Sequence, residues 1–334
     1  ELQDLVYEHG IEKVRLEGEF KPHPKDDSNT MIVRDQNKCV LCGRCVRACL
    51  EVQVNGVIDV AARGSDSYIT TFNHQSLKDS TCVFCGECVA SCPTGALTYK
   101  QARFRGRPWE LKKVATTCTY CGVGCQLELN VKDNKVVKVT SDHEIPGPNQ
   151  GSLCVKGRFG NDFIDHPDRL TTPLIKENGE FREASWEEAL DRIAGRFESI
   201  RKESGPEALA FFSSARCTNE ENYLLNKFAR AVIGTNNIDH CARLCHASTV
   251  AGLATSFGSG AMTNSIDDLK NSDVILVTGS NTTEMHPVIG STIKRAVKSG
   301  RCKLIVVDSR KIDLVDHAEI WLRQKPGTDV AWLN

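Results

Sequence analysis

Two identical cysteine runs limit what this chain can fold into more than any other feature of its sequence. Both have the spacing Cys-x2-Cys-x2-Cys-x3-Cys. Together they comprise Cys39, Cys42, Cys45, Cys49, Cys82, Cys85, Cys88 and Cys92. Repetition at this spacing indicates one structural unit used twice. Because three thiolates from one tight loop converge on a metal cluster at little cost in chain entropy, the runs predict a domain built around two clusters.

The spacing is that of bacterial two-cluster ferredoxins, in which the fourth cysteine of each run binds the cluster of the other run. We therefore expect a two-cluster ferredoxin-like domain over residues 31–102. One 4Fe-4S cluster would take Cys39, Cys42, Cys45 and Cys92. The other would take Cys82, Cys85, Cys88 and Cys49. Structural zinc, which also binds four thiolates, is the alternative, but zinc sites rarely use a doubled, interleaved run.

A third cysteine unit follows a basic stretch, residues 103–115, which we interpret as a linker. The unit has the spacing Cys-x2-Cys-x3-Cys and a distant fourth cysteine, and its members are Cys118, Cys121, Cys125 and Cys154. Residues 126–140 alternate apolar and polar side chains around a Lys-Asp-Asn turn, which predicts a β-hairpin. We expect a small β-rich domain over residues 116–165 that binds one further 4Fe-4S cluster, with zinc again the alternative.

Composition excludes several functional classes. The chain has 334 residues, with 42 basic and 43 acidic side chains and a net charge of −1, so it has no long-range field for nucleic acid or an anionic membrane. No apolar run approaches the roughly 18 residues of a membrane span. Only four of the 16 cysteines follow Cys154, although more than half of the chain lies beyond it. A long cysteine-poor segment after closely spaced cysteines favours metal clusters in a reducing compartment over a disulfide framework.

Residues 166–334 alternate helical and strand patterns. Ser185 and Glu188 form a capping box that opens a helix to about residue 202, and a strand at 209–213 precedes a helix at 219–233. Strands at 274–277 and 304–307 flank a helix at 290–298. This order predicts an α/β region with a parallel sheet and ligands at the carboxyl ends of its strands.

The ends of the chain suggest a fragment. Residues 1–30 are charged and end in a Pro/Asp-rich stretch, which we interpret as a connector from a missing N-terminal region. The first residue is Glu1 rather than Met, and residues 329–334 have the pattern of a helix that is cut short.

The fourth cysteine of the third unit begins the sequence Cys154-Val155-Lys156-Gly157. Here the unit resembles the amino-terminal domain of molybdenum or tungsten enzymes that carry two pterin guanine dinucleotides. The order of the three cysteine units resembles the catalytic subunit of cytoplasmic formate dehydrogenases, from about residue 31 onward. In that family the matching lysine lies between cluster and pterin, which implies that Lys156 takes part in electron transfer and cofactor binding.

Residues 240–246 read His-Cys-Ala-Arg-Leu-Cys-His and resemble the segment in which formate dehydrogenases place a metal-bound cysteine or selenocysteine followed by histidine. The resemblance implies that Cys245 binds the metal, and a soft thiolate suits Mo or W. It also implies that His246 is the acid-base partner, since imidazole titrates near neutrality. We interpret Cys217, Cys241 and Cys302 as buried, inert cysteines.

Loops at predicted strand ends are candidates for pterin contacts. Residues 277–281 resemble the family's loop that receives a pterin nucleotide. Its residue types suit that role, since glycine allows the ligand to approach the backbone closely and Ser and Asn add hydrogen bonds. A carboxylate such as Asp308 could accept the N–H donors of a guanine edge. The candidates are Gly279, Ser280, Asn281, Asp308, Arg310, Gly327 and Asp329. The chain has no G-x-G-x-x-G or Walker loop, so we expect no NAD or ATP site within it.

The resemblance implies a formate dehydrogenase or CO2 reductase with three 4Fe-4S clusters and a bis-molybdopterin guanine dinucleotide that holds Mo or W. Electrons would leave to flavin or iron-sulfur subunits that serve NAD, ferredoxin or a hydrogenase. The family's substrate arginine matches a stretch beyond Asn334.

Two alternatives remain. A non-catalytic relay, like the large iron-sulfur subunit of respiratory complex I, shares this architecture, although the retained Cys245-His246 pair argues against it. A cytoplasmic nitrate reductase also uses a cysteine ligand, but the histidine after Cys245 and the ferredoxin-like arm favour formate. An iron hydrogenase can share that arm, but the α/β region disfavours it.

Overall fold

The two cysteine runs fold alike because a glycine ends each turn. In the computed structural model, which describes residues 2–15, 18 and 21–334, Gly43 and Gly86 have φ values of 71° and 76° and precede α2 (Arg44–Arg47) and α3 (Glu87–Ser91). Glycine takes this left-handed conformation at little cost. After α2 the chain continues as a π-helical turn, Ala48–Val52. The predicted repeat is therefore visible as two equivalent turn-and-helix units.

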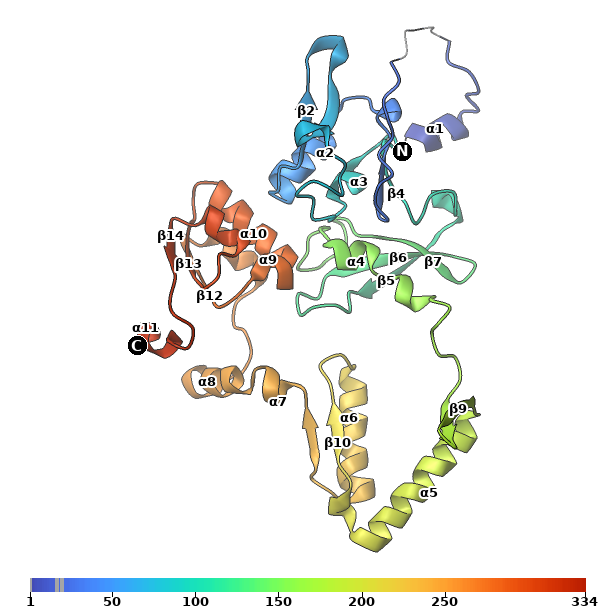
Figure 1. The fold of residues 1–334 in the computed structure, drawn as a ribbon, viewed down its shortest axis with the longest axis vertical. Coiled ribbons are helices and arrows are strands. Elements are labelled where there is room, and N and C mark those ends of the chain that lie inside the picture. Colours follow the sequence, from blue (N-terminus) through green and yellow to red (C-terminus); the bar gives the residue numbers. More distant parts are fainter. Residues whose placement is uncertain (1, 16–17, 19–20) are drawn as a thin grey trace. The chain divides into compact units, whose positions relative to one another are not determined.

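The chain divides into two compact units, Glu1–His166 with Asn264–Asn334 and Pro167–Thr263 (Figure 1). The predicted domain boundaries remain a prediction. Residues 1, 16–17 and 19–20 of the predicted connector lie outside the described residues, while Leu2–Glu8 form helix α1.

Two small antiparallel sheets support the cysteine runs of the first unit. Strand β1 (Ile32–Arg34) pairs with β4 (Leu97–Tyr99), and β2 (Ile58–Ala61) pairs with β3 (Tyr68–Thr71). The core beneath them contains nine buried residues: Ile32, Cys45, Val57, Ile58, Ile69, Leu77, Val89, Leu97 and Phe159. Phe159 belongs to the third cysteine unit, so the two cluster domains share one core.

The third cysteine unit is built on an antiparallel sheet of β5 (Lys112–Thr117), β6 (Gln126–Lys132) and β7 (Lys135–Thr140). The predicted hairpin is confirmed, and its turn residues Asp133 and Asn134 have φ values of 50° and 58°, as a tight two-residue turn requires. The linker interpretation is wrong for residues 112–115, because their backbone pairs with β6. Helix α4 (Val155–Phe159) begins directly after Cys154 and contacts β7 (Figure 1).

The rest of the first unit is a parallel sheet in the order β12 (Val274–Thr278), β13 (Lys303–Val307) and β14 (Ile320–Leu322). This confirms the two predicted strands and their parallel direction. Helices α9 (Thr282–Met285) and α10 (Pro287–Lys298) follow β12, and α11 (Asp329–Leu333) ends the chain. Leu304, Val306 and Leu314 are fully buried in the core between sheet and helices.

The second unit begins with a hairpin of β8 (Leu174–Glu177) and β9 (Glu180–Glu183). Helix α5 (Trp186–Ser204) starts as predicted, since the Ser185 side chain accepts a hydrogen bond from the Glu188 N–H at 3.1 Å. Strands β10 (Phe211–Ser213) and β11 (Ile238–His240) pair in parallel. The connection between them contains α6 (Asn219–Lys227), which continues as a π-helical turn, Phe228–Ile233. Helices α7 (Ala242–Cys245) and α8 (Ala247–Phe257) complete the unit.

None of the helices in the described part of the chain combines the length and the apolar sequence needed to cross a lipid bilayer.

Asn149 fastens the long loop that brings the chain back to Cys154. Its side chain is almost completely buried, and its Oδ1 accepts from the Gln126 N–H at 2.8 Å. Its Nδ2 donates to the Gln126 carbonyl, the Ser141 hydroxyl and the Ser152 carbonyl at 3.0–3.1 Å. One amide thus joins the start of β6 to both ends of the loop.

We expect Asn149→Ala to lower the free energy of unfolding by about 1–3 kcal/mol, because buried partners lose their hydrogen bonds. Asn149→Asp should be at least as damaging, since it removes the donors. Anaerobic urea unfolding followed by circular dichroism measures the change. The exposed Lys135→Ala in the neighbouring hairpin is the control and should change stability by less than about 0.5 kcal/mol. Equal losses of stability in the Asn149 and Lys135 variants would contradict the role of the Asn149 side chain in holding this loop.

Candidate metal centres

Two cavities in the ferredoxin-like domain gather the eight cysteines of the runs in interleaved sets. The lining of one cavity includes Cys39, Cys42, Cys45 and Cys92. The lining of the other includes Cys49, Cys82, Cys85 and Cys88. The structure thus brings together the two sets of four expected from the spacing. The last cysteine of each run lies beside the other run.

Backbone N–H groups point at several of these sulfur atoms. The N–H of Leu41 donates to Cys39 Sγ at 3.4 Å, that of Phe84 to Cys82 Sγ at 3.4 Å, and that of Val57 to Cys49 Sγ at 3.3 Å. Leu41 and Phe84 hold equivalent positions in the two runs and both have positive φ values, 55° and 50°. Hydrogen bonds to cysteine sulfur stabilise the thiolate and help to set a cluster's potential.

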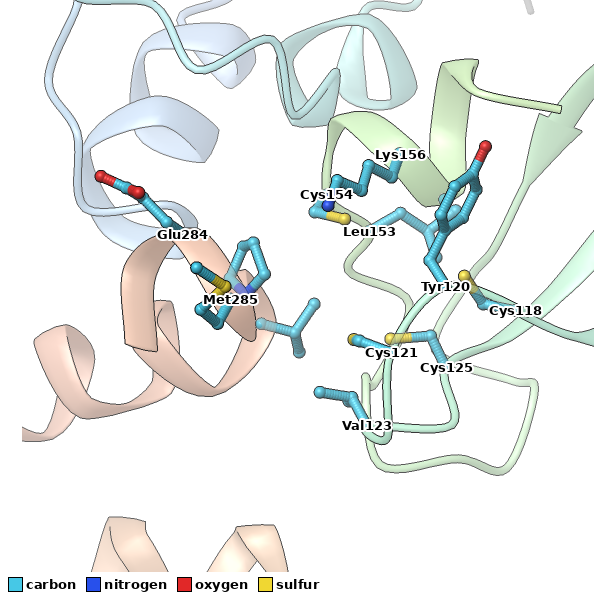
Figure 2. A pocket seen from close by; sticks show the side chains of 13 residues that line it. Cys118, Tyr120, Cys121, Val123, Cys125, Leu153, Cys154, Lys156, Glu284 and Met285 are labelled. Atoms are coloured by element: carbon cyan, nitrogen blue, oxygen red, sulfur yellow. The ribbon is translucent and has the colours of Figure 1, made fainter. Parts of the chain in front are cut away.

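A third cavity contains the remaining cysteine set (Figure 2). Its cysteines are Cys118, Cys121, Cys125 and Cys154. Lys156, on α4, lines the same cavity, and Met285 on α9 faces the cysteines from the other side in Figure 2. Val288 on α10 is buried with Val123, Cys125 and Leu153, which fixes these helices against the cysteine loop.

Burial makes many of these thiols hard to ionise. It raises the pKa of Cys45 to about 11 and the pKa values of Cys85 and Cys125 to about 12. Cys92 differs: burial raises its pKa, but hydrogen bonds from Leu97 and Thr94 outweigh that effect and lower it. Closely spaced thiols with raised pKa values suit a cationic centre, which compensates the thiolate charges.

The thiols surround each cavity rather than meeting at one point. Across residues 2–15, 18 and 21–334, no three His, Cys, Asp or Glu side chains are arranged to hold a single metal ion. Four thiols distributed around a cavity fit a cluster of several metal atoms, because its ligands bind at separate corners. The residues present therefore fit three iron-sulfur clusters.

Cys245 and His246 lie in the second unit, at the junction of α7 and α8, and both are exposed there. Their predicted metal and acid-base roles remain predictions. Cys302 is buried, as expected for an inert cysteine, but that expectation is wrong for Cys217 and Cys241, which are exposed. Cys241 lies at the end of β11, and its sulfur accepts from the Ala215 N–H at 3.2 Å.

The predicted pterin loops lie at the carboxyl ends of β12 and β13. Gly279 has a φ of 56°, and its N–H donates to the Val307 carbonyl at 3.0 Å. Asp308 is buried, and its carboxylate accepts from the N–H and the guanidinium of Arg310 at 2.9–3.2 Å. The hydrogen bond from Arg310 holds the pKa of Asp308 below its usual range. The carboxylate is therefore already paired at the place where a guanine contact is predicted.

The remaining candidate residues have local partners. Ser280 Oγ lies 3.0 Å from Thr282 Oγ1, and Asn281 Oδ1 accepts from the Thr283 hydroxyl at 3.3 Å. Gly327 has a φ of 80°, and Asp329 accepts from the Gln324 amide at 3.3 Å. Gly279, Ser280 and Asn281 lie in the loop that follows β12. Asp308 directly follows the neighbouring β13 and so lies near that loop, since the two strands pair along their full lengths.

Two residues at the junction of the cluster domains were missed by sequence reasoning. Arg158 and Glu87 form a buried ion pair with a separation of 2.7 Å. The available signal was weak: a charged residue follows each glycine in Cys85-Gly86-Glu87 and Lys156-Gly157-Arg158. Their proximity depends on how the two domains fold together, which local patterns do not reveal.

Known families match four stretches of the chain, of which the first three overlap in part. Residues 29–98 match the ferredoxin-like domain of NADH-quinone oxidoreductase subunit 3, and residues 74–128 match the 4Fe-4S dicluster domain. Residues 111–166 match the molybdopterin oxidoreductase Fe4S4 domain. Residues 169–334 match molybdopterin oxidoreductase. The chain thus carries ferredoxin-like 4Fe-4S domains followed by a molybdopterin oxidoreductase region.

Known relatives are much longer than this chain. A Bacillus subtilis (strain 168) protein named "Probable oxidoreductase YjgC" is 37% identical over the whole chain, which spans 38% of that protein. A Staphylococcus aureus (strain bovine RF122 / ET3-1) protein named "Putative formate dehydrogenase SAB2186c" is 38% identical with the same coverage. The solved structure of acetylene hydratase from Pelobacter acetylenicus is 28% identical with a TM-score of 0.55, and the match covers 66% of this chain and 30% of that one.

The interleaved pairing can be tested one cluster at a time. We expect Cys39→Ala and Cys92→Ala to alter the same cluster signal in electron paramagnetic resonance spectra of the reduced protein, because both line one cavity. Cys82→Ala and Cys49→Ala should alter a different one. Cys302→Ala, a buried cysteine outside the three cavities, should leave iron and sulfide content unchanged. The pairing is wrong if Cys92→Ala instead matches Cys82→Ala.

Proposed function

Because the chain belongs to the molybdopterin oxidoreductase family, we propose that it forms part of the catalytic subunit of a molybdenum- or tungsten-dependent formate dehydrogenase or CO2 reductase. The reaction is HCOO⁻ → CO2 + H⁺ + 2 e⁻ or its reverse. The proposed cofactors are three 4Fe-4S clusters and a bis-molybdopterin guanine dinucleotide that holds the metal. The proposed location is the cytoplasm.

One observation carries the proposal: the cavity that contains Cys118, Cys121, Cys125 and Cys154 also contains Lys156 and is closed by α9 and α10. Those two helices follow the strand-end loop of Gly279, Ser280 and Asn281. A loop that is suited to a nucleotide therefore leads directly into the helices that line the cluster cavity. A centre that passes two electrons into a cluster needs its binding loop beside that cluster's cavity.

The bound pterin metal would supply a centre that accepts two electrons and is reset one electron at a time through the clusters. Cys245 would provide a soft thiolate ligand for that metal. His246, the next residue, would accept the proton that formate oxidation releases. Lys156 would contribute a positive charge between the cluster and the pterin, where it can bind anionic groups.

The names of relatives support formate as the substrate, but the family is chemically broad. Relatives in Staphylococcus aureus carry formate dehydrogenase names, whereas one similar solved structure is a hydratase. The segment Arg-Leu-Cys-His around Cys245 favours formate over nitrate. Electron-accepting flavin or iron-sulfur subunits, linked to NAD, ferredoxin or a hydrogenase, are the proposed partners.

A second candidate is a relay without a pterin metal. The match of residues 29–98 to a ferredoxin-like domain of NADH-quinone oxidoreductase favours it. The two candidates differ in metal content, because a relay holds iron alone. Elemental analysis of the holoprotein should find Mo or W together with iron. Iron without either heavy metal, in a preparation whose clusters can be reduced, would establish the relay.

We expect Cys245→Ser to reduce formate-dependent dye reduction by more than about 100-fold, because loss of a metal ligand exceeds the usual effect of losing an outer-shell contact. Iron content should stay unchanged, since Cys245 lines none of the three cysteine cavities. The matched control is Cys241→Ser, which changes an exposed cysteine four residues earlier and should retain activity. Full activity of Cys245→Ser would rule out metal ligation by this sulfur.

His246→Gln should slow formate oxidation by roughly 10²-fold or more, the usual contribution of a positioned acid-base group. The glutamine preserves polarity but cannot take up a proton. Added imidazole should restore part of the rate. The readout is the pH dependence of kcat for wild type and variant. A variant with the wild-type rate and pH profile would remove His246 from the mechanism.

A further inference from the structure

Arg158 crosses from one cluster domain into the other. It lies on α4, four residues after Cys154, and its backbone N–H donates to the Cys154 carbonyl at 3.0 Å. Its side chain is completely buried, although arginine is rarely buried without a specific partner. A charged group in this position requires an explanation beyond packing.

All three branches of the guanidinium contact the ferredoxin-like domain. Nε donates to the Cys85 carbonyl at 2.6 Å, Nη2 to Glu87 Oε1 at 2.7 Å, and Nη1 to the Tyr99 hydroxyl at 3.0 Å. Cys85 lines the cavity of Cys49, Cys82 and Cys88. Arg158 therefore bonds at one end to a cysteine of the third cavity and at the other end to a cysteine of the neighbouring one.

Glu87 reinforces the connection from the opposite side. Its Oε1 also accepts from the Leu153 N–H at 3.1 Å, directly before Cys154. Gly86, between Cys85 and Glu87, leaves the space that Arg158 occupies: a Cβ there would lie 2.2 Å from Arg158 Cδ. Residues 85–87 and 153–158 thus interlock through a buried ion pair and hydrogen bonds.

The domains do not depend on Arg158 alone for attachment. Phe159, the next residue, is buried in the ferredoxin-like core, and its ring lies 5.6 Å from that of Tyr99. Val155 packs against the same core. An arginine that only held the domains together would duplicate these apolar contacts while requiring a charge to be desolvated.

We propose that Arg158 and Glu87 are positioning residues that couple the cluster of Cys118, Cys121, Cys125 and Cys154 to the cluster of Cys49, Cys82, Cys85 and Cys88 and set the potentials between them. The connection runs from Cys154 through its carbonyl, the Arg158 backbone and side chain, and the Cys85 carbonyl. Two hydrogen bonds and otherwise covalent bonds join the two cysteines. The inference rests on the proposed iron-sulfur sites and is independent of the substrate.

The charges of the pair predict opposite effects. Reduction adds one negative charge to a cluster, so a nearby positive charge favours the reduced form and a nearby negative charge disfavours it. Arg158→Met leaves the carboxylate of Glu87 without its counter-charge and should lower the midpoint potential of the nearby clusters. Glu87→Gln keeps an acceptor for Leu153 and Arg158 but removes the negative charge, so it should raise that potential.

The test uses the iron-loaded holoprotein, reduced chemically with dithionite at a series of potentials and examined by electron paramagnetic resonance. We expect Arg158→Met to lower and Glu87→Gln to raise the potential, and Arg158→Met to weaken the magnetic interaction between the two clusters. Arg158→Lys, which keeps the positive charge, should lower the potential less than Arg158→Met does. Phe159→Leu, which alters packing at the same junction, should leave the potentials and the interaction unchanged.

Shifts of the same sign in Arg158→Met and Glu87→Gln, or no shift in either, would overturn the proposal. If Arg158→Met fails to bind iron, the rise expected for Glu87→Gln is decisive by itself. Absence of every cluster signal in the wild type would refute the iron-sulfur assignment instead. If both variants shift the potential as expected but formate does not reduce the protein, the coupling stands and only the proposed substrate is rejected.

Discussion

The structure depends on bringing four thiols from separate stretches of chain into one small space, three times. Cys92 joins Cys39, Cys42 and Cys45 across an intervening run, and Cys154 joins its partners across a complete hairpin. Closing such loops costs chain entropy, and burial raises the pKa of several of the thiols. A metal centre compensates both costs at once. Folding of these domains and cluster binding are therefore coupled.

Polar ties hold the parallel-sheet region against the cluster domains. Arg295 and Lys298 on α10 donate to the carbonyls of Val52 and Leu50 at 2.9 Å and 2.8 Å, and both carbonyls belong to the π-helical turn that contains Cys49. Buried Val288, at the start of α10, packs on the third cysteine loop. Because α10 contacts both domains, the loop after β12 has a defined position relative to the third cavity.

Local chemistry made part of this arrangement predictable from the sequence. The interleaved cysteine sets follow from spacing, the start of α5 from the cap at Ser185, and the hairpin from its alternating pattern around a tight turn. Strand β5 was not predictable, because basic residues such as Lys112 and Lys113 give no periodic signal and pair only once β6 is formed. The Arg158–Glu87 pair escaped for a related reason: its members are 71 residues apart and meet through the docking of two domains.

The exposure of the cysteines gives the order of the centres along the proposed electron path. Among the twelve cysteines of the three cavities, all within the described residues, Cys42 alone is exposed. Val40 and Leu41 beside it are also largely open to solvent, at 58% and 45%. The cavity of Cys85 lies between, since Arg158 ties it to the third cavity and Cys49 and Cys92 interleave it with the first. Electron transfer to another protein needs a centre near the surface, whereas internal transfer benefits from exclusion of water. The path would therefore connect the cavity of Lys156, through that of Cys85, with that of Cys42 at the surface.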